Sequence, residues 1–215
     1  PQALKDAAIA AISKGRGNQY PPPHGLPLLR EAIAAHQQRF YGIEVDPVTQ
    51  VVVGTGASEV IQSALLALVD TGDEVVVFEP WFDIYAAGIS LARGHRVGVP
   101  MSGPALRPDL DALRRAVGPR TRLILLNSPH NPTGVVFTRA ELEAIAQVAA
   151  EHDLVVISDE VYEHIVFDGH EHVAFATLPG MAERTISIGS AGKSLSMTGW
   201  KVGWATGPAD LIGAL

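Results

Sequence analysis

Short apolar runs alternate along the chain with stretches that repeat apolar residues at helical spacing, and this alternation limits the folds that the chain can adopt. The runs lack the polar and apolar alternation of a half-exposed strand, so we expect both faces of each to be buried, as in a parallel sheet. The runs are Val51–Val53, Val75–Phe78, Leu123–Leu126, Leu154–Ile157 and Thr185–Ile188. Strands that alternate with helices predict a three-layer α/β domain, in which helices flank a mostly parallel sheet and the crossovers are right-handed.

The helices are predicted from apolar residues that recur three and four positions apart. The helical sets are Leu29, Ile33 and Phe40; Val60, Ile61, Ala64, Leu65 and Leu68; and Leu142, Ile145, Ala146 and Ala149. Turn residues separate the elements: Thr71-Gly72-Asp73 divides a helix from a strand, and Gly118-Pro119 ends a helix. Pro21-Pro22-Pro23 predicts a rigid extended loop, because proline is excluded from a helix interior.

Charge and composition exclude several classes of protein. The 215 residues carry a formal net charge of -7, which argues against a nucleic-acid-binding surface, since such a surface is basic. No apolar run reaches the ~18 residues that a membrane-spanning helix needs. The chain contains no cysteine, which excludes disulfides and thiolate chemistry and fits a cytoplasmic protein.

The segments that follow the predicted strands are polar or rich in glycine. They are Gly56–Ser58, Glu79–Phe82, Asn127–Gly134, Ser158–Tyr162 and Gly189–Ser194. Ligands of open α/β sheets bind outside the carboxyl ends of the strands. We therefore expect these segments to converge on one ligand site.

Gly56-Ala57-Ser58 follows a strand and opens a predicted helix. The free N–H groups and the positive dipole end at a helix N-terminus suit a phosphate group. A plainer interpretation is an ordinary N-cap at Ser58. A dinucleotide-binding fingerprint that begins at Gly54 is disfavoured, because Glu59 stands where the third glycine is required.

Asp159 and Tyr162 come directly after a predicted buried strand. A carboxylate at this place can stabilise a protonated nitrogen in the aromatic ring of a cofactor, and the hydroxyl of Tyr162 can reach the same ligand. Two other interpretations stay open for Asp159: a residue that caps a helix, and an acidic residue that binds magnesium beside a nucleotide.

Lys193 lies in the segment Gly192-Lys193-Ser194, which has part of a phosphate-loop motif. The complete motif needs a glycine where Ser187 stands, so nucleotide triphosphate binding is poorly supported. A lysine on a short polar loop in a cleft suits imine formation, and Lys201 is a nearby cation that favours the deprotonated amine. A solvated surface lysine is the plainer alternative.

Two further segments have plain interpretations as turns. In Asn127–Gly134 the prolines fix the backbone and the asparagines offer amide donors at a strand end, but the same residues are typical of turns. His170-Glu171-His172 lacks a third ligand at a metal-binding spacing. We expect a solvated turn there, and no metal site.

Taken together, these segments resemble class I and II, fold-type I aminotransferases that depend on pyridoxal 5'-phosphate (PLP), over nearly the whole chain. The resemblance is carried by Asn18–Pro21, Gly56–Ser58, Gly72–Val75, Glu79-Pro80, Asn131–Gly134, Ser158–Tyr162, Ser190–Lys193 and Thr198–Lys201. These segments occur in the order of the family. The strongest likeness is to the branch that holds the kynurenine–oxoglutarate, methionine and N-succinyldiaminopimelate aminotransferases.

The resemblance implies that PLP is the cofactor and that Lys193 forms a Schiff base with it. Lys193 would then carry the proton between the substrate Cα and the cofactor C4′. Asp159 would keep the pyridine nitrogen protonated, while Asn131 and Tyr162 would donate hydrogen bonds to the ring O3′. Phe82 would stack on the ring face.

The resemblance also implies a set of phosphate ligands. They are Gly56, Ala57, Ser58, Ser190 and Lys201. Tyr20 would reach the phosphate bound by the neighbouring subunit, which implies a homodimer. Asn127, together with Asn131, would contact the substrate.

The chain departs from the family's pattern at Lys201 and in the segments that it lacks. Lys201 stands where many relatives have arginine, and it keeps the charge without the bidentate fork. The small C-terminal domain, with its arginine for the substrate carboxylate, is missing, as is the N-terminal segment that covers the site. We divide the chain into N-terminal helices and an interface loop (1–45), a PLP-binding large domain (46–208) and the start of a truncated helix (209–215).

The expected function is transamination between an amino acid and a 2-oxo acid, although a fragment of this kind can bind PLP and still lack turnover. Three alternatives stay open. The chain can belong to a PLP-dependent β-lyase that acts on cysteine conjugates, since both reactions begin with loss of the Cα proton. It can also be a phosphotransferase that binds ATP through Gly192-Lys193-Ser194, or a PLP-binding domain without catalysis.

Overall fold

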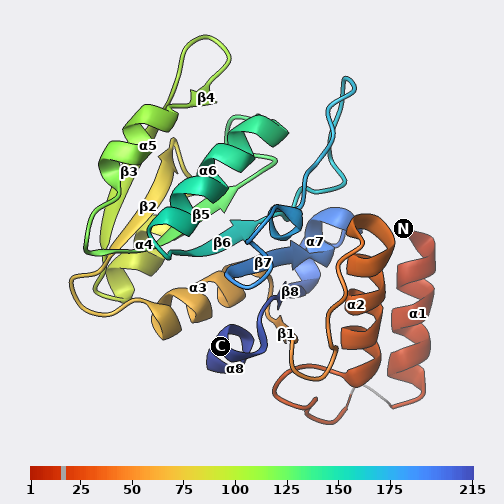
Figure 1. Ribbon diagram of the computed structural model, residues 1–215. Helices are drawn as coiled ribbons and strands as arrows, with labels where there is room; N and C mark the ends of the chain where they lie inside the picture. The colour runs from red at the N-terminus through yellow and green to blue at the C-terminus, as the bar shows by residue number, and fades with distance from the viewer. Residues whose placement is uncertain (16–17) are drawn as a thin grey trace.

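The computed structural model describes residues 1–15 and 18–215. Its centre is an eight-stranded sheet with the strand order β1-β8-β7-β6-β5-β2-β3-β4. The strands are β1 (Val51–Gly54), β2 (Glu74–Glu79), β3 (His95–Ser102), β4 (Arg107–Pro108), β5 (Thr121–Asn127), β6 (Val155–Asp159), β7 (Thr185–Ser190) and β8 (Gly203–Thr206). Helices lie on both sides of this sheet (Figure 1), which confirms the predicted three-layer α/β fold.

The sheet is mostly parallel, as predicted. β3, β2, β5, β6 and β7 pair in parallel, whereas β8 is antiparallel to both β7 and β1. β1 therefore runs in the same direction as β7 and ends at the same edge of the sheet. The run Val51–Val53 differs from the expectation in one respect, because it enters the sheet through an antiparallel pair.

Three strands carry no continuous apolar run and were not predicted. β3 begins with exposed His95 and Arg96 and alternates between exposed and buried residues near its end, as a strand next to a sheet edge does. β4 has only two residues. β8 is a four-residue strand that begins with glycine and ends with threonine, so its apolar signal is short even though all four residues are buried.

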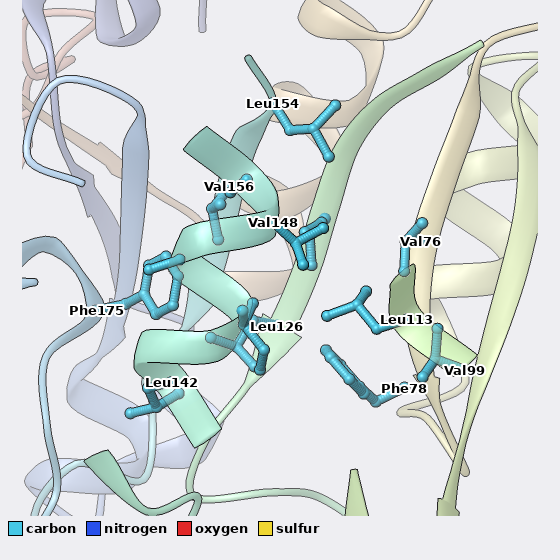
Figure 2. Close-up of a cluster of buried hydrophobic side chains, with 14 of the residues drawn as sticks. Val76, Phe78, Val99, Leu113, Leu126, Leu142, Val148, Leu154, Val156 and Phe175 are labelled. Atoms are coloured by element: carbon cyan, nitrogen blue, oxygen red, sulfur yellow. The ribbon is translucent and has the colours of Figure 1, made fainter. Parts of the chain in front are cut away.

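The pleat of the sheet builds two apolar cores. Val76 and Phe78 of β2 point into the core beneath α5 (Leu110–Ala116) and α6 (Arg139–Glu151), which Figure 2 shows. Val75 and Val77 point to the opposite face, beneath α3 (Ala57–Leu68), α4 (Ile84–Leu91) and α8 (Ala209–Ala214). The apolar sets predicted for α3 and α6 thus face the sheet from opposite sides, whereas Phe40 of the third predicted set is 50% exposed.

The N-terminal region adds two helices beside β1. α2 (Pro27–Tyr41) starts with proline, whose missing N–H costs nothing in the first turn, and ends at Gly42 in the left-handed conformation with φ of 69°. Ile33 packs with Val51 and Trp204 in a small third core. α1 (Gln2–Ser13) lies next to α2 and buries no residue (Figure 1). In the part of the chain that the structure describes, no helix has the length and apolarity to cross a bilayer.

Candidate active site

A cavity of about 190 Å³ opens at the carboxyl ends of β1, β6 and β7. The predicted residues that line it are Gly56, Ala57, Ser58, Phe82, Asn131, Asp159, Tyr162, Ser190, Lys193 and Lys201. Two predicted residues do not line it: Asn127 lies beneath the cavity wall, and Tyr20 lies on the surface. Tyr85 and Thr55 also line the cavity and were not singled out from the sequence, and Thr198, from the segment Thr198–Lys201, lines it without having been given a role.

A glycine-dependent turn forms one end of the cavity. Gly56, the N-cap of α3, has a φ of 85°, a conformation that strongly favours glycine. On the neighbouring strand, a Cβ at Gly203 would come within 2.2 Å of the Ala57 nitrogen, so only glycine lets the two backbones approach this closely. The N-cap is thus Gly56 and not Ser58, which corrects the plainer interpretation of this segment.

The two charged residues near this turn differ in where they point. The Glu59 carboxylate accepts a hydrogen bond from the Thr55 N–H and lines a separate cavity on the other side of the turn. Lys201 follows a short 3-10 helix, Thr198–Trp200, and adopts the left-handed conformation with φ of 56°. Lys201 lines the main cavity, so the turn has a cation and free N–H groups beside it.

Asp159 is the buried acid of the cavity. Its carboxylate accepts hydrogen bonds from the Tyr85 hydroxyl and, at 3.4 Å, from the Val161 N–H. Burial raises the pKa of Asp159 to about 6, although both hydrogen bonds and the charge of Lys193 act in the opposite direction. Tyr85 is itself buried, and burial together with the nearby carboxylate raises its pKa well above the ordinary value.

Lys193 projects from α7 (Ala191–Ser194), the short helix that follows β7. Ser190 caps this helix by accepting a hydrogen bond from the Gly192 N–H at 3.2 Å, and Thr198 donates to the Gly192 carbonyl at 2.9 Å. The Lys193 Nζ lies 5.3 Å from the centre of the Tyr162 ring. The N–H groups of Ala191 and Gly192 are already paired within the chain, so these two backbone donors are not free for a nucleotide phosphate.

Asn127 connects two sides of the cavity wall. Its Nδ2 donates to the Asp159 carbonyl at 2.8 Å, and its Oδ1 accepts from the Asn131 N–H at 2.7 Å. The side chain is buried, and both ends of the amide are occupied by backbone groups. This arrangement fixes Asn131 relative to Asp159. The predicted substrate contact of Asn127 stays a prediction.

His130 occupies the loop between Asn127 and Asn131 without lining the cavity. Its ring stacks on Phe137 with centroids 6.2 Å apart, and its Nδ1 lies 2.8 Å from the Thr133 hydroxyl. Burial lowers the pKa of His130 to about 4. The imidazole is therefore neutral near pH 7.

Two other predicted positions lie apart from the cavity. Tyr20 is fully exposed, in the loop before α2. The expected solvated turn at His170-Glu171-His172 is wrong for its last residue, because the His172 side chain is only 4% exposed. His172 packs against the Tyr41 ring and lies 3.6 Å from the Glu160 carboxylate, two partners that come from distant parts of the chain.

The eight-stranded sheet with helices on both sides matches the large domain of solved aminotransferases, as the resemblance in sequence predicted. The chain belongs to the aminotransferase class I and II family, whose sequence model matches residues 1–215. The predicted resemblance is confirmed by this match.

Relatives of this chain are named as aminotransferases. The probable N-succinyldiaminopimelate aminotransferase DapC of Mycobacterium tuberculosis is 52% identical over 214 residues, which are 99% of this chain and 54% of the relative. The kynurenine–oxoglutarate transaminase of Dictyostelium discoideum is 44% identical over 232 residues, 100% of this chain and 53% of the relative. The solved structure of N-succinyldiaminopimelate aminotransferase from Mycobacterium tuberculosis is 51% identical, with a TM-score of 0.97 over 100% of this chain and 56% of that one. The chain thus spans about half the length of these relatives.

Proposed function

We propose that this chain holds the cofactor site of a PLP-dependent aminotransferase, which moves an amino group between an amino acid and a 2-oxo acid. The observation that carries the proposal is that Lys193 and the buried Asp159 line one cavity, at whose end a glycine turn and Lys201 offer a site for an anion. Membership of the aminotransferase family supports the same conclusion.

The residues of the cavity fit PLP in shape and in charge. The backbone approach at Gly203 leaves a cradle beside the start of α3, where free N–H groups and a dipole end suit a phosphate. Asp159 is a buried carboxylate whose pKa is raised to about 6. A cationic partner such as a protonated ring nitrogen would offset the free-energy cost of keeping this buried carboxylate ionised. Phe82 lines the cavity and has its ring edge against Tyr85, with centroids 5.7 Å apart.

Each side chain has a separate task in this proposal. Lys193 would bind the cofactor covalently through its Nζ and would later carry the proton to and from the substrate Cα. Asp159 would hold a proton on the ring nitrogen, and Tyr162 and Asn131 would donate hydrogen bonds to the ring oxygen. Bound PLP would supply the electron sink that makes the Cα proton acidic.

The phosphate and the ring face are assigned to other residues. Phe82 would cover the ring and exclude water from it. The phosphate ligands would be Gly56, Ala57, Ser58, Ser190 and Lys201. Asn127 and Asn131 would contact the substrate, the former from beneath the cavity.

The proposal extends to the assembly and the location of the protein. Tyr20 is exposed and outside the cavity of its own chain, as expected if it serves the phosphate site of a partner subunit in a homodimer. We place the protein in the cytoplasm. The other three interpretations are not favoured, because the relatives reported above are named as aminotransferases and the Gly192 N–H is already paired.

Borohydride reduction tests the proposal directly. Purified protein should be yellow with PLP, and borohydride should lock the cofactor on Lys193, as peptide mass spectrometry will show. Lys193→Ala should abolish the labelling, whereas Lys5→Ala, which removes an exposed lysine of α1, should leave it unchanged. Labelling at another lysine, or a colourless protein that binds ATP, would refute the assignment.

Turnover assays separate transamination from its alternatives. With an amino acid and a 2-oxo acid, the protein should release the 2-oxo acid derived from the donor only in proportion to the acceptor consumed. Pyruvate released from a cysteine conjugate without an acceptor would instead show a β-lyase. Yellow protein that reacts with neither would favour either a PLP-binding domain without catalysis or a fragment that lacks the rest of the enzyme.

A further inference from the structure

Three side chains with metal-binding atoms meet outside the cavity. His36 comes from α2, while Glu163 and His164 come from the loop that carries Asp159 and Tyr162 at its start. The two Nε2 atoms are 2.9 Å apart and share a hydrogen bond in the absence of a cation. The Glu163 Oε1 lies 3.7 Å from the Nε2 of His36 and 3.9 Å from that of His164.

These separations are close to those around a tetrahedral cation. A zinc ion binds imidazole nitrogen and carboxylate oxygen at about 2.0–2.2 Å, which places tetrahedral ligand atoms about 3.3–3.5 Å from one another. The three measured separations bracket this value, so shifts of less than about 1 Å bring all three atoms onto one ion. Two histidines and one glutamate also form one of the established protein ligand sets for zinc.

The surroundings of Glu163 leave one carboxylate oxygen facing the two imidazoles. The Tyr41 hydroxyl donates a hydrogen bond to Oε2, so Oε1 is the atom that faces His36 and His164. The Glu163 side chain is only 3% exposed, and within the described ranges no lysine or arginine forms an ion pair with it. A bound cation would compensate the buried charge.

The two imidazoles give the cluster a route to solvent. The side chains of His36 and His164 are 21% and 32% exposed, which leaves room for a water molecule as a fourth ligand. The Nδ1 of His36 is buried without a hydrogen-bond partner among the described residues. An outer hydrogen bond on a ligand histidine typically strengthens metal binding about 10–100-fold, so we expect this site to bind a cation more weakly, by about that factor, than a site whose histidines are both held in this way.

We infer that His36, Glu163 and His164 form a binding site for a divalent transition-metal cation of the zinc type. The cation ties α2 to the loop that follows β6, across 128 residues of sequence. Its occupancy thus stabilises the folded chain and fixes the loop that carries Tyr162. The inference is independent of the cofactor, since none of the three ligands lines the cavity.

Cobalt provides a direct probe of the geometry. Protein without an affinity tag, stripped with a chelator, is titrated with Co²⁺ and followed by visible absorption, then with Zn²⁺ by calorimetry. We expect one equivalent of each metal, the intense visible bands of a tetrahedral Co²⁺ site, and displacement of Co²⁺ by Zn²⁺. The melting temperature should rise with Zn²⁺ concentration.

Variants identify the ligands. H36Q and H164Q should each weaken Zn²⁺ binding at least about tenfold and abolish the cobalt bands. H170Q, which removes an exposed histidine of the same loop region, is the matched control and should bind like the parent. Because His164 is exposed, H164Q should keep the parent's far-ultraviolet circular dichroism, so a negative result is not a folding defect.

Two outcomes overturn the inference. One is Zn²⁺ binding that H36Q and H164Q leave unchanged, which would place the metal elsewhere. The other is the absence of one-equivalent binding of Co²⁺ or Zn²⁺ in parent protein that is folded, which would show that the two rings only share a hydrogen bond.

Discussion

The Tyr85 hydroxyl donates a hydrogen bond to the Asp159 carboxylate, although the two residues are 74 positions apart in sequence. Tyr85 lies on α4 and Asp159 at the end of β6, and both line the cavity. The phenol thus stabilises the ionised form of the acid that would hold a cationic ring nitrogen. A hydrogen bond to a charged group is worth about 1.5–3 kcal/mol, so this contact is large enough to affect cofactor binding.

We predict that Tyr85→Phe weakens PLP binding about tenfold or more, because the variant keeps the ring and removes the hydrogen bond that favours the Asp159 anion. Equilibrium dialysis of PLP measures the change. In a double-mutant cycle with Asp159→Asn, the second loss of the hydroxyl should cost little, since its partner is already neutral. Strictly additive effects of the two substitutions would show that the contact has no role in binding.

Asp159 should make the PLP-free protein less stable as the pH rises. Its pKa is about 6 in the folded chain against an ordinary value of 3.8, so the folded state binds the proton more tightly than the unfolded state. The contribution of Asp159 to the free energy of unfolding is fully present below about pH 4 and is lost as the pH rises through 6. At about 1.4 kcal/mol per pKa unit, the loss is roughly 3 kcal/mol. Urea titrations across this range should show the loss in the parent and in the exposed control Asp111→Asn. Asp159→Asn should lack it.

His130 should make the free energy of unfolding rise with pH, opposite to the effect of Asp159, over nearly the same pH range. Burial lowers its pKa from 6.5 to about 4, so the unfolded chain takes up the proton first. The stabilisation is present above about pH 6.5 and is lost as the pH falls through 4, again by roughly 3 kcal/mol. His130→Gln should therefore flatten the acid side of the urea-derived stability curve, while His152→Gln at an exposed position should not. If His130→Gln lost stability on acidification as steeply as the parent does, the contribution of His130 would be disproved.

Gly203→Ala should destabilise the protein and impair phosphate binding. The new methyl group would lie 2.2 Å from the Ala57 nitrogen, so the turn at Gly56 or strand β8 has to move. Overpacking of this kind costs about 1–3 kcal/mol, which thermal unfolding detects, and PLP should bind more weakly. Gly118→Ala is the control, because a Cβ there meets no atom within 4 Å.

Asn127→Ala distinguishes a structural role from a substrate contact. The substitution leaves the Asn131 N–H without its partner, while the Asp159 carbonyl keeps a hydrogen bond from the Ser128 N–H, so we expect a loss of about 1–3 kcal/mol in the free energy of unfolding. PLP affinity should fall as well, because Asn131 and Asp159 are no longer fixed. A raised KM for the amino acid with unchanged stability would instead support the direct substrate contact.

The sequence predicted the strand ends of this site well, because each apolar run of a parallel sheet is followed by the residues that face the ligand. Lys193, Asp159 and Gly56 could be found in this way. Tyr85 could not, since it follows no strand and its role depends on where α4 packs. A buried tyrosine usually needs a partner for its hydroxyl, but the pattern does not say which one.

Contacts between distant segments limited the prediction elsewhere. β8 was missed because four residues with a terminal glycine and threonine give little apolar signal, although its neighbours in the sheet bury it completely. The cluster of His36 with His164 joins residues 128 positions apart, so no local spacing indicates it. The burial of His172 depends in the same way on Tyr41 of α2.

The antiparallel insertion of β8 between β1 and β7 has a consequence for the order of assembly. β1 is an outermost strand whose one neighbour is β8, and Val51 pairs with Thr206. Pairing β1 with β8 closes the stretch of chain from Gly54 to Gly203, which costs conformational entropy and slows folding. During synthesis, β1 has no strand to pair with until β8 has been made. We therefore expect the glycine turn after β1 and the lysine after β7 to come together late in folding, and a nascent chain that stops before Gly203 to have most of the predicted ligands of the site without the site itself.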